Sequence, residues 1–173
     1  MVSMEHDEPT ERHEPTPMPL HAPKSYKFPQ TPDGLLPWSH ALERLERARS
    51  YWLATTRPDG RPHVTPVWGA WVDGALYFDG LPTTQWARNL KRNPAAAVHL
   101  ESGDDVVILE GVMDDLETSA ELGTRIVAAW DAKYGRLHPD PVGSGIFRFT
   151  PRTGRGWSTS SLTDGTRWQF DEG

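Results

Sequence analysis

Residues 51–79 read YWLATTRPDGRPHVTPVWGAWVDGALYFD, and this stretch decides the fold. Its first six positions are rich in aromatic and β-branched residues, which predicts a strand over 51–56. A PDG turn follows, and the alternating residues 63–72 predict a second strand. The next DG pair is typical of a hairpin turn that leads into a third strand over 75–79. The stretch therefore predicts a meander of three antiparallel strands.

A proline in the middle of the second predicted strand, Pro66, removes a hydrogen-bond donor from the ladder. We therefore expect a sheet edge or a bulge at this position. Trp68 and Trp71 lie three residues apart on the same strand, which puts them on opposite faces. At most one of the two belongs to the core of a one-sided sheet.

The rest of the chain alternates helices with strands. Apolar residues at three- and four-residue spacing predict helices over 37–49, 83–92 and 118–134, and Thr118 starts a capping box for the last. Further strands are predicted over 95–101, 106–114, 145–150, 156–159 and 166–170. Six to eight antiparallel strands with three helices between them must close or pair their edges. This predicts a mainly β protein with a small antiparallel barrel.

Length, charge and composition exclude several classes of protein. A chain of 173 residues is one domain long, and its net charge of -6 disfavours a nucleic-acid partner. The absence of cysteine excludes disulfides, iron–sulfur clusters and a thiol nucleophile. No apolar run could span a bilayer, and the N-terminus lacks the basic and apolar regions of a signal peptide. We therefore expect a cytoplasmic protein without a membrane partner.

Residues 1–34 differ in composition from the rest. They hold seven of the 16 prolines and more acidic than basic side chains. Such a segment buries too little apolar surface to offset the entropy of ordering it. It is therefore interpreted as a flexible, Pro-rich acidic arm, in which Tyr26 and Phe28 could dock onto the folded body. Residues 35–173 form the predicted folded domain.

No pattern of side chains identifies a catalytic centre carried by the protein itself. There is no Gly-x-Ser-x-Gly, Walker or Rossmann motif, and the histidines are scattered. His99 and Glu101 could share a strand face and hold a metal, but a solvated strand face explains them more simply. We assign no catalytic residue and no metal site.

Residues 80–94, GLPTTQWARNLKRNP, form a candidate phosphate site. A strand ends in a Gly-Pro turn and enters a short helix through Thr83 and Thr84. Free N–H groups at a helix start and nearby hydroxyls suit a phosphate, and Arg88 and Lys91 add positive charge. The alternative is an N-capped surface helix with a solvated basic face.

Four motifs follow one another in a characteristic order. They are YWLAT at 51–55, DGRPHVTPVW at 59–68, DGALYF at 73–78, and ARNL at 87–90 with an Asn-Pro pair shortly after it. In this order and spacing the chain resembles the pyridoxamine 5'-phosphate oxidase-like split-barrel family, and within it the flavin/deazaflavin oxidoreductases. The match covers roughly residues 37–115 well and the C-terminal third more loosely.

The resemblance implies a split β-barrel of about six strands, with a short helix beside the phosphate and one long helix. It also implies a homodimer with a cofactor groove at the interface. The cofactor is FMN or the deazaflavin F420, and a few members bind haem. The implied cofactor-binding residues are Arg61, His63, Val64, Thr65, Pro66, Val67 and Trp68 along the ring, Thr83, Thr84, Trp86, Arg88 and Asn89 near the phosphate, and Trp157, Arg167 and Trp168 from the partner chain.

The chain departs from the family pattern at position 86, where many members carry a lysine and this chain has Trp86. A neutral indole cannot replace an ammonium. Either Arg88, Arg57 or Arg61 takes over, or the ligand is held differently, or the phosphate site is lost.

Three hypotheses follow. The leading one is an enzyme, an oxidoreductase that uses FMN or F420, with a slight preference for F420, to transfer hydride to or from a small conjugated substrate. The second is a non-catalytic flavin or haem binder with an altered phosphate site, in which His63 or His99 would be the axial haem ligand. The third is the same fold with an altered groove and another ligand.

Overall fold

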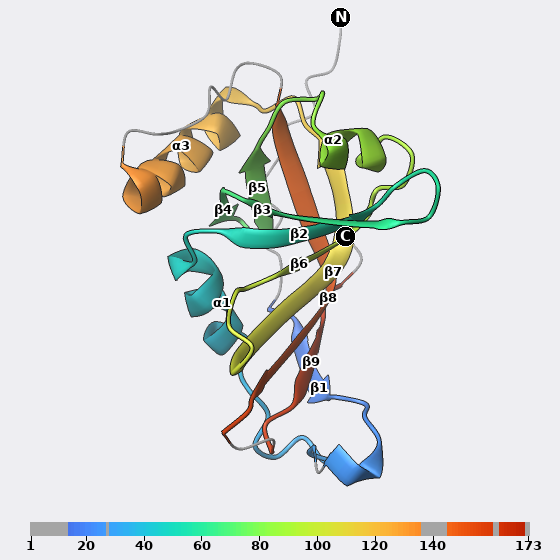
Figure 1. The fold of residues 1–173 in the computed structure, drawn as a ribbon. Helices are drawn as coiled ribbons and strands as arrows, with labels where there is room; N and C mark the ends of the chain where they lie inside the picture. Colours follow the sequence, from blue (N-terminus) through green and yellow to red (C-terminus); the bar gives the residue numbers. More distant parts are fainter. Residues whose placement is uncertain (1–13, 27, 136–144, 161–162, 172–173) are drawn as a thin grey trace, which may run out of the picture.

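The computed structural model describes residues 14–26, 28–135, 145–160 and 163–171. Within these ranges nine strands form one antiparallel sheet, with three α-helices and one short 3-10 helix around it (Figure 1). No helix in these ranges is long and apolar enough to cross a membrane. The elements are β1 (Thr16–Pro19), η1 (Lys24–Tyr26), α1 (Trp38–Arg47), β2 (Tyr51–Thr56), β3 (Pro62–Val67), β4 (Gly69–Val72), β5 (Ala75–Asp79), α2 (Gln85–Leu90), β6 (Ala95–His99), β7 (Asp105–Asp115), α3 (Ala120–Tyr134), β8 (Ile146–Ser158) and β9 (Thr166–Gln169).

The sheet is an open, split barrel. Its main path runs β1-β9-β8-β7-β6-β2-β3, and a branch from β8 continues through β5 to β4. The strand β8 pairs with β5 through its first residues and with β9 through its later ones. Within the described residues the sheet has three free ends, β1, β3 and β4. The last two are consecutive in the sequence, and no ladder joins them. The predicted mainly β, antiparallel split barrel is confirmed.

Individual elements differ from their predictions in a few places. The predicted strand 63–72 breaks at Trp68, so that β3 pairs with β2 and β4 pairs with β5. The two predicted strands over 145–159 are one long strand, β8. The three helices lie within the predicted ranges, but the N-cap of α3 is Ser119, whose side chain accepts a hydrogen bond from the Leu122 N–H. Thr118 was therefore one position too early.

Residues 16–19 correct the interpretation of the N-terminal segment as a flexible arm. They form β1, which adds to the free edge of β9, and prolines are tolerated on such an outer strand. Leu20 is buried, and its N–H donates to the Gly165 carbonyl at 3.0 Å. Phe28 packs against Gly165 and lies 6.3 Å from the ring of Trp157. A few apolar side chains thus dock the segment, whereas residues 1–13 lie outside the described ranges.

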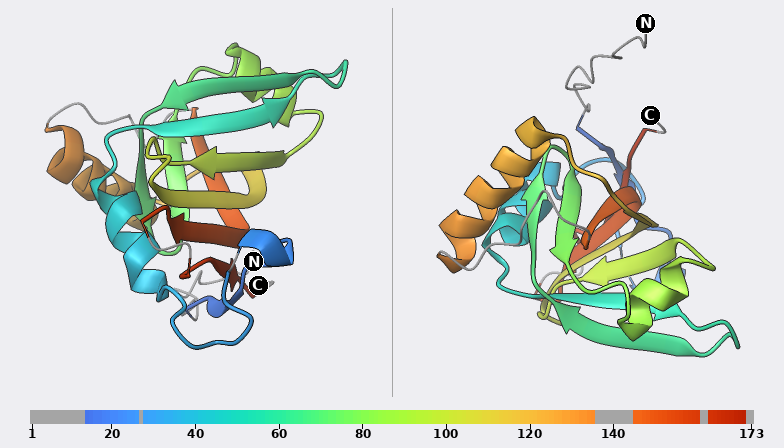
Figure 2. Two further views of the ribbon diagram at one scale, coloured as in Figure 1. Left: turned by 60° about the horizontal axis from the view of Figure 1, so that its bottom comes forward. Right: turned by 90° about the horizontal axis from the view of Figure 1, so that it is seen from above.

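The apolar side chains form two clusters. The larger fills the barrel, where Trp38 packs edge-on against Trp168 with a centroid distance of 5.5 Å. The smaller cluster lies between α3 and the β4–β5 pair, and Ile126 and Trp130 belong to it. Figure 2 shows α3 running alongside these two strands. The long helix therefore covers the end of the branch that contains β4.

Side chains from α3 satisfy the backbone at the break between β3 and β4. The Tyr134 hydroxyl accepts from the Gly69 N–H at 3.1 Å and donates to the Arg49 carbonyl at 2.8 Å. Lys133 Nζ donates to the Gly69 carbonyl at 3.1 Å and to the Tyr51 hydroxyl at 2.6 Å. These bonds tie the break to α3, to β2 and to the chain that follows α1.

We expect Gly69→Ala to lower the free energy of unfolding by ~1–3 kcal/mol, the usual cost of overpacking a core. A Cβ at this position would lie 2.6 Å from the Phe78 ring and 2.8 Å from the Tyr77 carbonyl oxygen. Urea denaturation of the wild type and the variant measures the loss. Gly103→Ala is the matched control, because nothing lies within 4 Å of a Cβ there. Equal losses in the two variants would contradict the prediction.

Burial of Lys133 predicts a pH-dependent contribution to stability. Burial lowers its pKa to about 8, whereas an unfolded lysine keeps its proton to about pH 10.4. Between these values the unfolded chain binds more protons, so the contribution of Lys133 to stability increases with pH. We expect the free energy of unfolding of the wild type to increase relative to that of Lys133→Met between about pH 8 and 10. Chemical denaturation at several pH values checks this, and a constant difference would count against it.

Candidate functional site

The candidate site lies along β3, the strand at one end of the sheet. Its only strand partner in the described ranges is β2, in a register that pairs Pro66 with Trp52. Proline has no N–H, so Pro62 and Pro66 fit a ladder only where their nitrogens point away from β2. Val64 lies midway between them and shares their orientation, since backbone direction alternates along a strand. Its N–H and carbonyl are therefore free to bind a ligand at this edge.

The side chains of β3 divide between two faces. Val64 and Trp68 are 52% and 48% exposed. His63 and Thr65 point to the inner face and are half-buried, while Val67 is buried in the barrel core. The side chain of Val67 is thus unavailable to a ligand, so its place along the ring stays a prediction about the backbone of the strand, and its neighbours along the strand remain accessible.

Trp68 has a fixed orientation at the end of β3. Its ring is stacked on Tyr134 with a centroid distance of 5.0 Å and an interplanar angle of 8°. The Tyr134 hydroxyl is itself held by the backbone of Gly69 and Arg49. The exposed part of the indole is therefore a pre-oriented flat surface beside the strand edge.

Helix α2 begins next to this edge, but part of the predicted phosphate site is used by the helix itself. The Thr84 side chain is the N-cap and accepts from the Ala87 N–H at 3.3 Å. Trp86 is buried, packs edge-on against Phe147 at 4.6 Å, and lies where a Cβ on Gly80 would be. The prediction that Trp86 faces a phosphate is therefore wrong, because the apolar face of this short helix turns the indole into the core. Thr83 is exposed at the helix start.

Asn89 also has a structural role. It is fully buried, and its Nδ2 donates to the Thr55 hydroxyl at 2.9 Å while its Oδ1 accepts from Gln85 Nε2 at 2.8 Å. Both ends of the amide are thus used to fix α2 to β2, which contradicts its prediction as a phosphate ligand. The sequence analysis did not identify Thr55 or Gln85, although the four-residue spacing of Gln85 and Asn89 on one helix was a usable signal.

The three residues predicted to close a partner's groove lie at the far end of the sheet from β3. Trp168 is completely buried, and its indole N–H donates to the Leu36 carbonyl at 3.1 Å, so it is a core residue and this prediction is wrong. Trp157 and Arg167 are half-buried on β8 and β9. Within one chain they do not meet the residues of β3, and their contribution to a second subunit stays a prediction.

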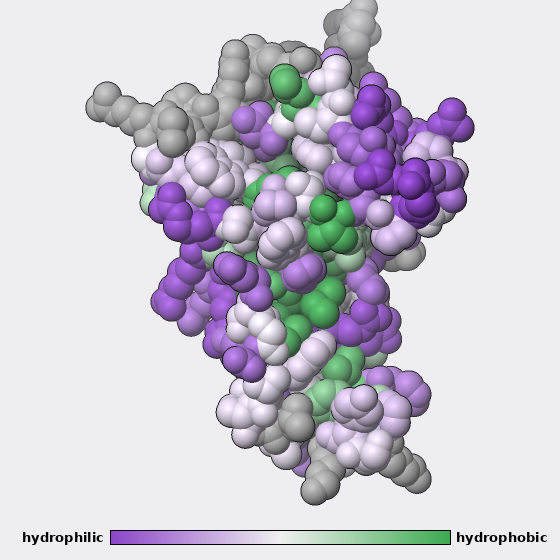
Figure 3. Space-filling view, in the orientation of Figure 1, coloured by the Kyte–Doolittle hydropathy of each residue, from purple (hydrophilic) through white to green (hydrophobic). Residues whose placement is uncertain are grey.

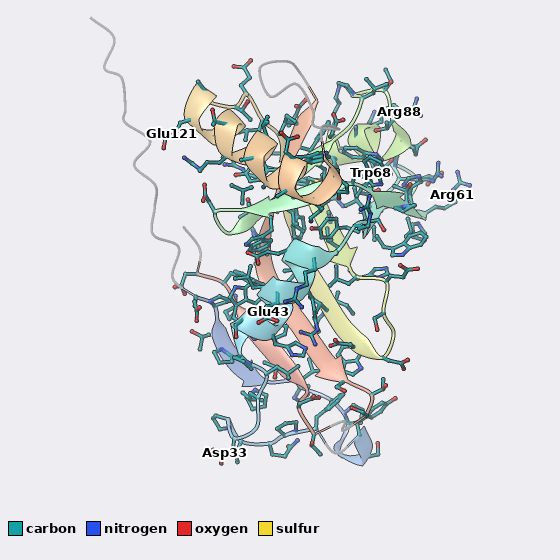
Figure 4. The ribbon with its side chains drawn as sticks, turned by 90° about the vertical axis from the view of Figure 1, so that its left-hand side faces the viewer. Asp33, Glu43, Arg61, Trp68, Arg88 and Glu121 are labelled. Carbon is teal, nitrogen blue, oxygen red and sulfur yellow. The ribbon has the colours of Figure 1, made fainter. Side chains whose placement is uncertain are left out.

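A rim of positive charge surrounds the β3 edge. The turn before β3 carries Arg57 and Arg61, and Arg61 pairs with Asp59 at 2.8 Å. Hydrogen bonds from Arg61 lower the pKa of the exposed Asp59 carboxyl. On α2, Arg88 is exposed and donates to a neutral acceptor, Gln85 Oε1, at 3.1 Å. Figure 4 shows Arg61, Arg88 and Trp68 on the same side of the molecule.

His63 has an unpaired nitrogen in this rim. Its Nδ1 is shielded from solvent and has no hydrogen-bond partner, and no other side-chain nitrogen or oxygen in the described ranges shares both properties. Burial, with a smaller effect of the Arg57 charge, lowers the pKa of His63. An unsatisfied buried polar atom is unfavourable, so it fits a place where a polar ligand binds.

In the described part of the chain, no group of three or more His, Asp or Glu side chains is placed so that it could hold a metal ion. His99 bonds through Nδ1 with the Leu100 carbonyl at 2.8 Å and stacks on Trp52 with an interplanar angle of 11°.

A model of the pyridoxamine 5'-phosphate oxidase family matches residues 38–158, more than half of the 173 residues. Among solved structures, a conserved hypothetical protein from Mycobacterium tuberculosis is 28% identical over 75% of this chain and 89% of its own, with a TM-score of 0.62. A protein described as an F420 reductase is 26% identical over 72% of this chain and 98% of its own, with a TM-score of 0.52.

A more distant neighbour is HutZ, a haem storage protein from Vibrio cholerae. It is 19% identical over 65% of this chain and 88% of its own, with a TM-score of 0.55, and this likeness shows the fold alone. No match is found among curated proteins. The family match begins at α1 and ends with β8, so it includes the β3 edge and α2. The chain therefore belongs to the pyridoxamine 5'-phosphate oxidase family.

Proposed function

We propose that the protein is an oxidoreductase that binds FMN or F420 along β3 and acts on a small conjugated substrate. The observation that carries this proposal is the open edge of β3, with one free N–H at Val64 and carbonyls at Pro62, Val64 and Pro66. When bound, either cofactor supplies hydride transfer through its own ring. The protein then needs no acid or base in a fixed motif, which agrees with the absence of one in the sequence.

The residues present fit such a cofactor. The pyrimidine edge of either ring system carries an N–H donor between two carbonyl acceptors. The Val64 N–H can pair with one of these acceptors, and a β3 carbonyl can pair with the ring N–H. The fixed indole of Trp68 forms a flat wall at one end of the strand. At the other end Arg57, Arg61 and Arg88 provide charge for a phosphate. These groups bind and orient the cofactor and exclude water from one side of it.

The preference for F420 over FMN rests on similarity. The F420 reductase neighbour is 26% identical to this chain, so the deazaflavin is the first cofactor to test. FMN needs one phosphate cradle, whereas the longer acidic tail of F420 favours a wider basic rim. The spread of cations from the β2–β3 turn to α2 is compatible with both.

The homodimer is part of the proposal, since the outer face of the sheet carries many apolar side chains beside the ion pair of Glu110 with Arg155. Register places a run of apolar side chains across β3, β2, β6 and β7, and Val64 is 52% exposed on this face. The run consists of Val64, Trp52, Ala54, Ala95, Ala97, Ile108 and Val112. Figure 3 shows hydrophobic side chains in the middle of the view, at the height of these strands. A second copy would cover this surface and bring its own β8 and β9 toward the groove.

A haem binder is the second candidate. His99 supports it, because a histidine whose Nδ1 donates to a carbonyl keeps Nε2 free as a ligand. Its position on the apolar outer face suits a porphyrin. A Soret band after addition of haem, lost in His99→Ala, would favour this function over the flavin.

The first test is titration of the purified protein with FMN and with F420, followed by tryptophan fluorescence. We expect quenching and a Kd at or below the micromolar range for one cofactor. Val64→Pro removes the free N–H and should weaken binding about tenfold, the effect of one hydrogen bond. Val64→Ala is the matched control, because it shortens the side chain and keeps the N–H. Equal affinities of these two variants would show that the strand edge is not used.

The dimer is tested by replacing Ile108, a half-buried residue in the middle of the apolar face. We expect a wild-type dimer and an Ile108→Glu monomer in light scattering coupled to size exclusion, since a buried unpaired carboxylate opposes association. Leu81→Glu is the control, because Leu81 is 70% exposed outside that run. Circular dichroism checks that both variants are folded. A monomeric wild type, or an unaffected Ile108→Glu dimer, would reject this interface.

A further inference from the structure

Most of the polar side chains predicted to contact a phosphate already have partners within the chain. The Thr84 hydroxyl caps α2, and the Asn89 amide is shared between Thr55 and Gln85. His63 differs, because its Nδ1 is buried and unpaired within the described ranges. Unlike Thr84 and Asn89, His63 therefore has a hydrogen-bonding position left for a ligand.

The position of His63 connects the strand edge with α2. In the β2–β3 register it lies directly across from Thr55, whose hydroxyl binds Asn89 of that helix. The imidazole thus lies on the same inner face of the β2–β3 pair as Thr55, to which α2 is attached through Asn89. A ligand that extends from the β3 edge toward α2 would pass this side chain.

The charged groups on the elements around His63 favour an anion. On the β2–β3 turn they are Arg57, Arg61 and Asp59, and Asp59 is already paired with Arg61. On α2 the nearest charged residue in sequence to the attachment point is Arg88, which donates to the neutral Gln85. The turn and this position of α2 therefore carry three guanidinium groups and one carboxylate.

One cation is nevertheless missing relative to the family pattern. Many members carry a lysine at the position of Trp86, and the indole here is turned into the core with 6% of its surface exposed. Trp86 is neutral and buried, so it can neither carry the charge of that lysine nor turn toward a ligand. A phosphate bound here would therefore need its countercharge from another residue.

We propose that the imidazole of His63 supplies this charge: it contacts the phosphate of the cofactor and takes up one proton as the phosphate binds. The proton comes from solvent, and no covalent bond forms or breaks. The identity of the ligand rests on the proposed function. The physical basis is that burial and Arg57 lower the pKa of His63, while a phosphate dianion beside it favours the charged imidazolium.

The first experiment follows the imidazole directly. NMR titration of His63, identified by comparison with His63→Gln, gives its pKa in the free protein and in saturating inorganic phosphate. We expect phosphate to raise the pKa of His63, by about one unit if the contact is worth a tenfold change in affinity. An unchanged midpoint would overturn the proposal.

The second experiment measures the Kd of FMN from pH 6 to 8.5. We expect affinity to fall with rising pH more in the wild type than in His63→Gln, by up to about tenfold. In His63→Lys, whose charge is permanent in this range, the fall should match that of His63→Gln at higher overall affinity. The titration of FMN itself is common to all three proteins and cancels in the comparison. Riboflavin, which lacks the phosphate, should bind all three alike.

The outcomes separate this proposal from the proposed function. A wild type that binds FMN or F420 with the same pH profile as His63→Gln would reject the role of His63 and retain the function. A protein that binds neither cofactor, but in which inorganic phosphate raises the pKa of His63, would retain the anion site and reject the function. Failure of both readouts would reject both.

Discussion

The backbone of Gly69 is the point on which the architecture depends. The segment formed by β3 and β4 pairs first with β2 and then with β5. It must therefore leave one ladder and enter the other within a single residue, Trp68. Such a break exposes a donor and an acceptor in a buried place, and both must be satisfied. Tyr134 and Lys133 do this from the last turn of α3, and the same two side chains reach Arg49 and Tyr51. A helix far along the chain thus determines where the barrel splits.

The candidate site is a consequence of this split. Because β4 turns away to β5, no strand in the described part of the chain covers the outer edge of β3, and its backbone groups stay available. Tyr134 also fixes Trp68, since the indole stacks on the same ring whose hydroxyl binds the backbone of Gly69. The edge and its flat wall are therefore positioned by one hydrogen-bonded cluster, and the arginine rim follows from the turn and the helix that flank the edge.

The sequence predicted the elements well because strand and helix periodicity are local signals. It could not predict the break at Trp68, since the alternation of residues continues across it and only tertiary pairing divides the strand. It also could not tell a buried indole from a ligand-binding one: Trp86 and Trp168 are core residues, whereas Trp68 is half exposed. The strand β1 was missed because prolines dominate the composition of its segment. The location of the site along a strand and a helix therefore stays a prediction, whereas several of the side chains assigned to it are buried in the core.

The alternation of proline and valine on β3 has a consequence for the protein when no ligand is bound at the strand edge. An open sheet edge can recruit strands from other chains, which is a first step toward ordered aggregation. An incoming strand needs donors at regular intervals, and Pro62 and Pro66 withhold them on either side of Val64. A small polar molecule can be held by a single donor, whereas an extended polypeptide finds too few. The edge can thus stay open for a ligand in a crowded cell without becoming a template for amyloid-like assembly.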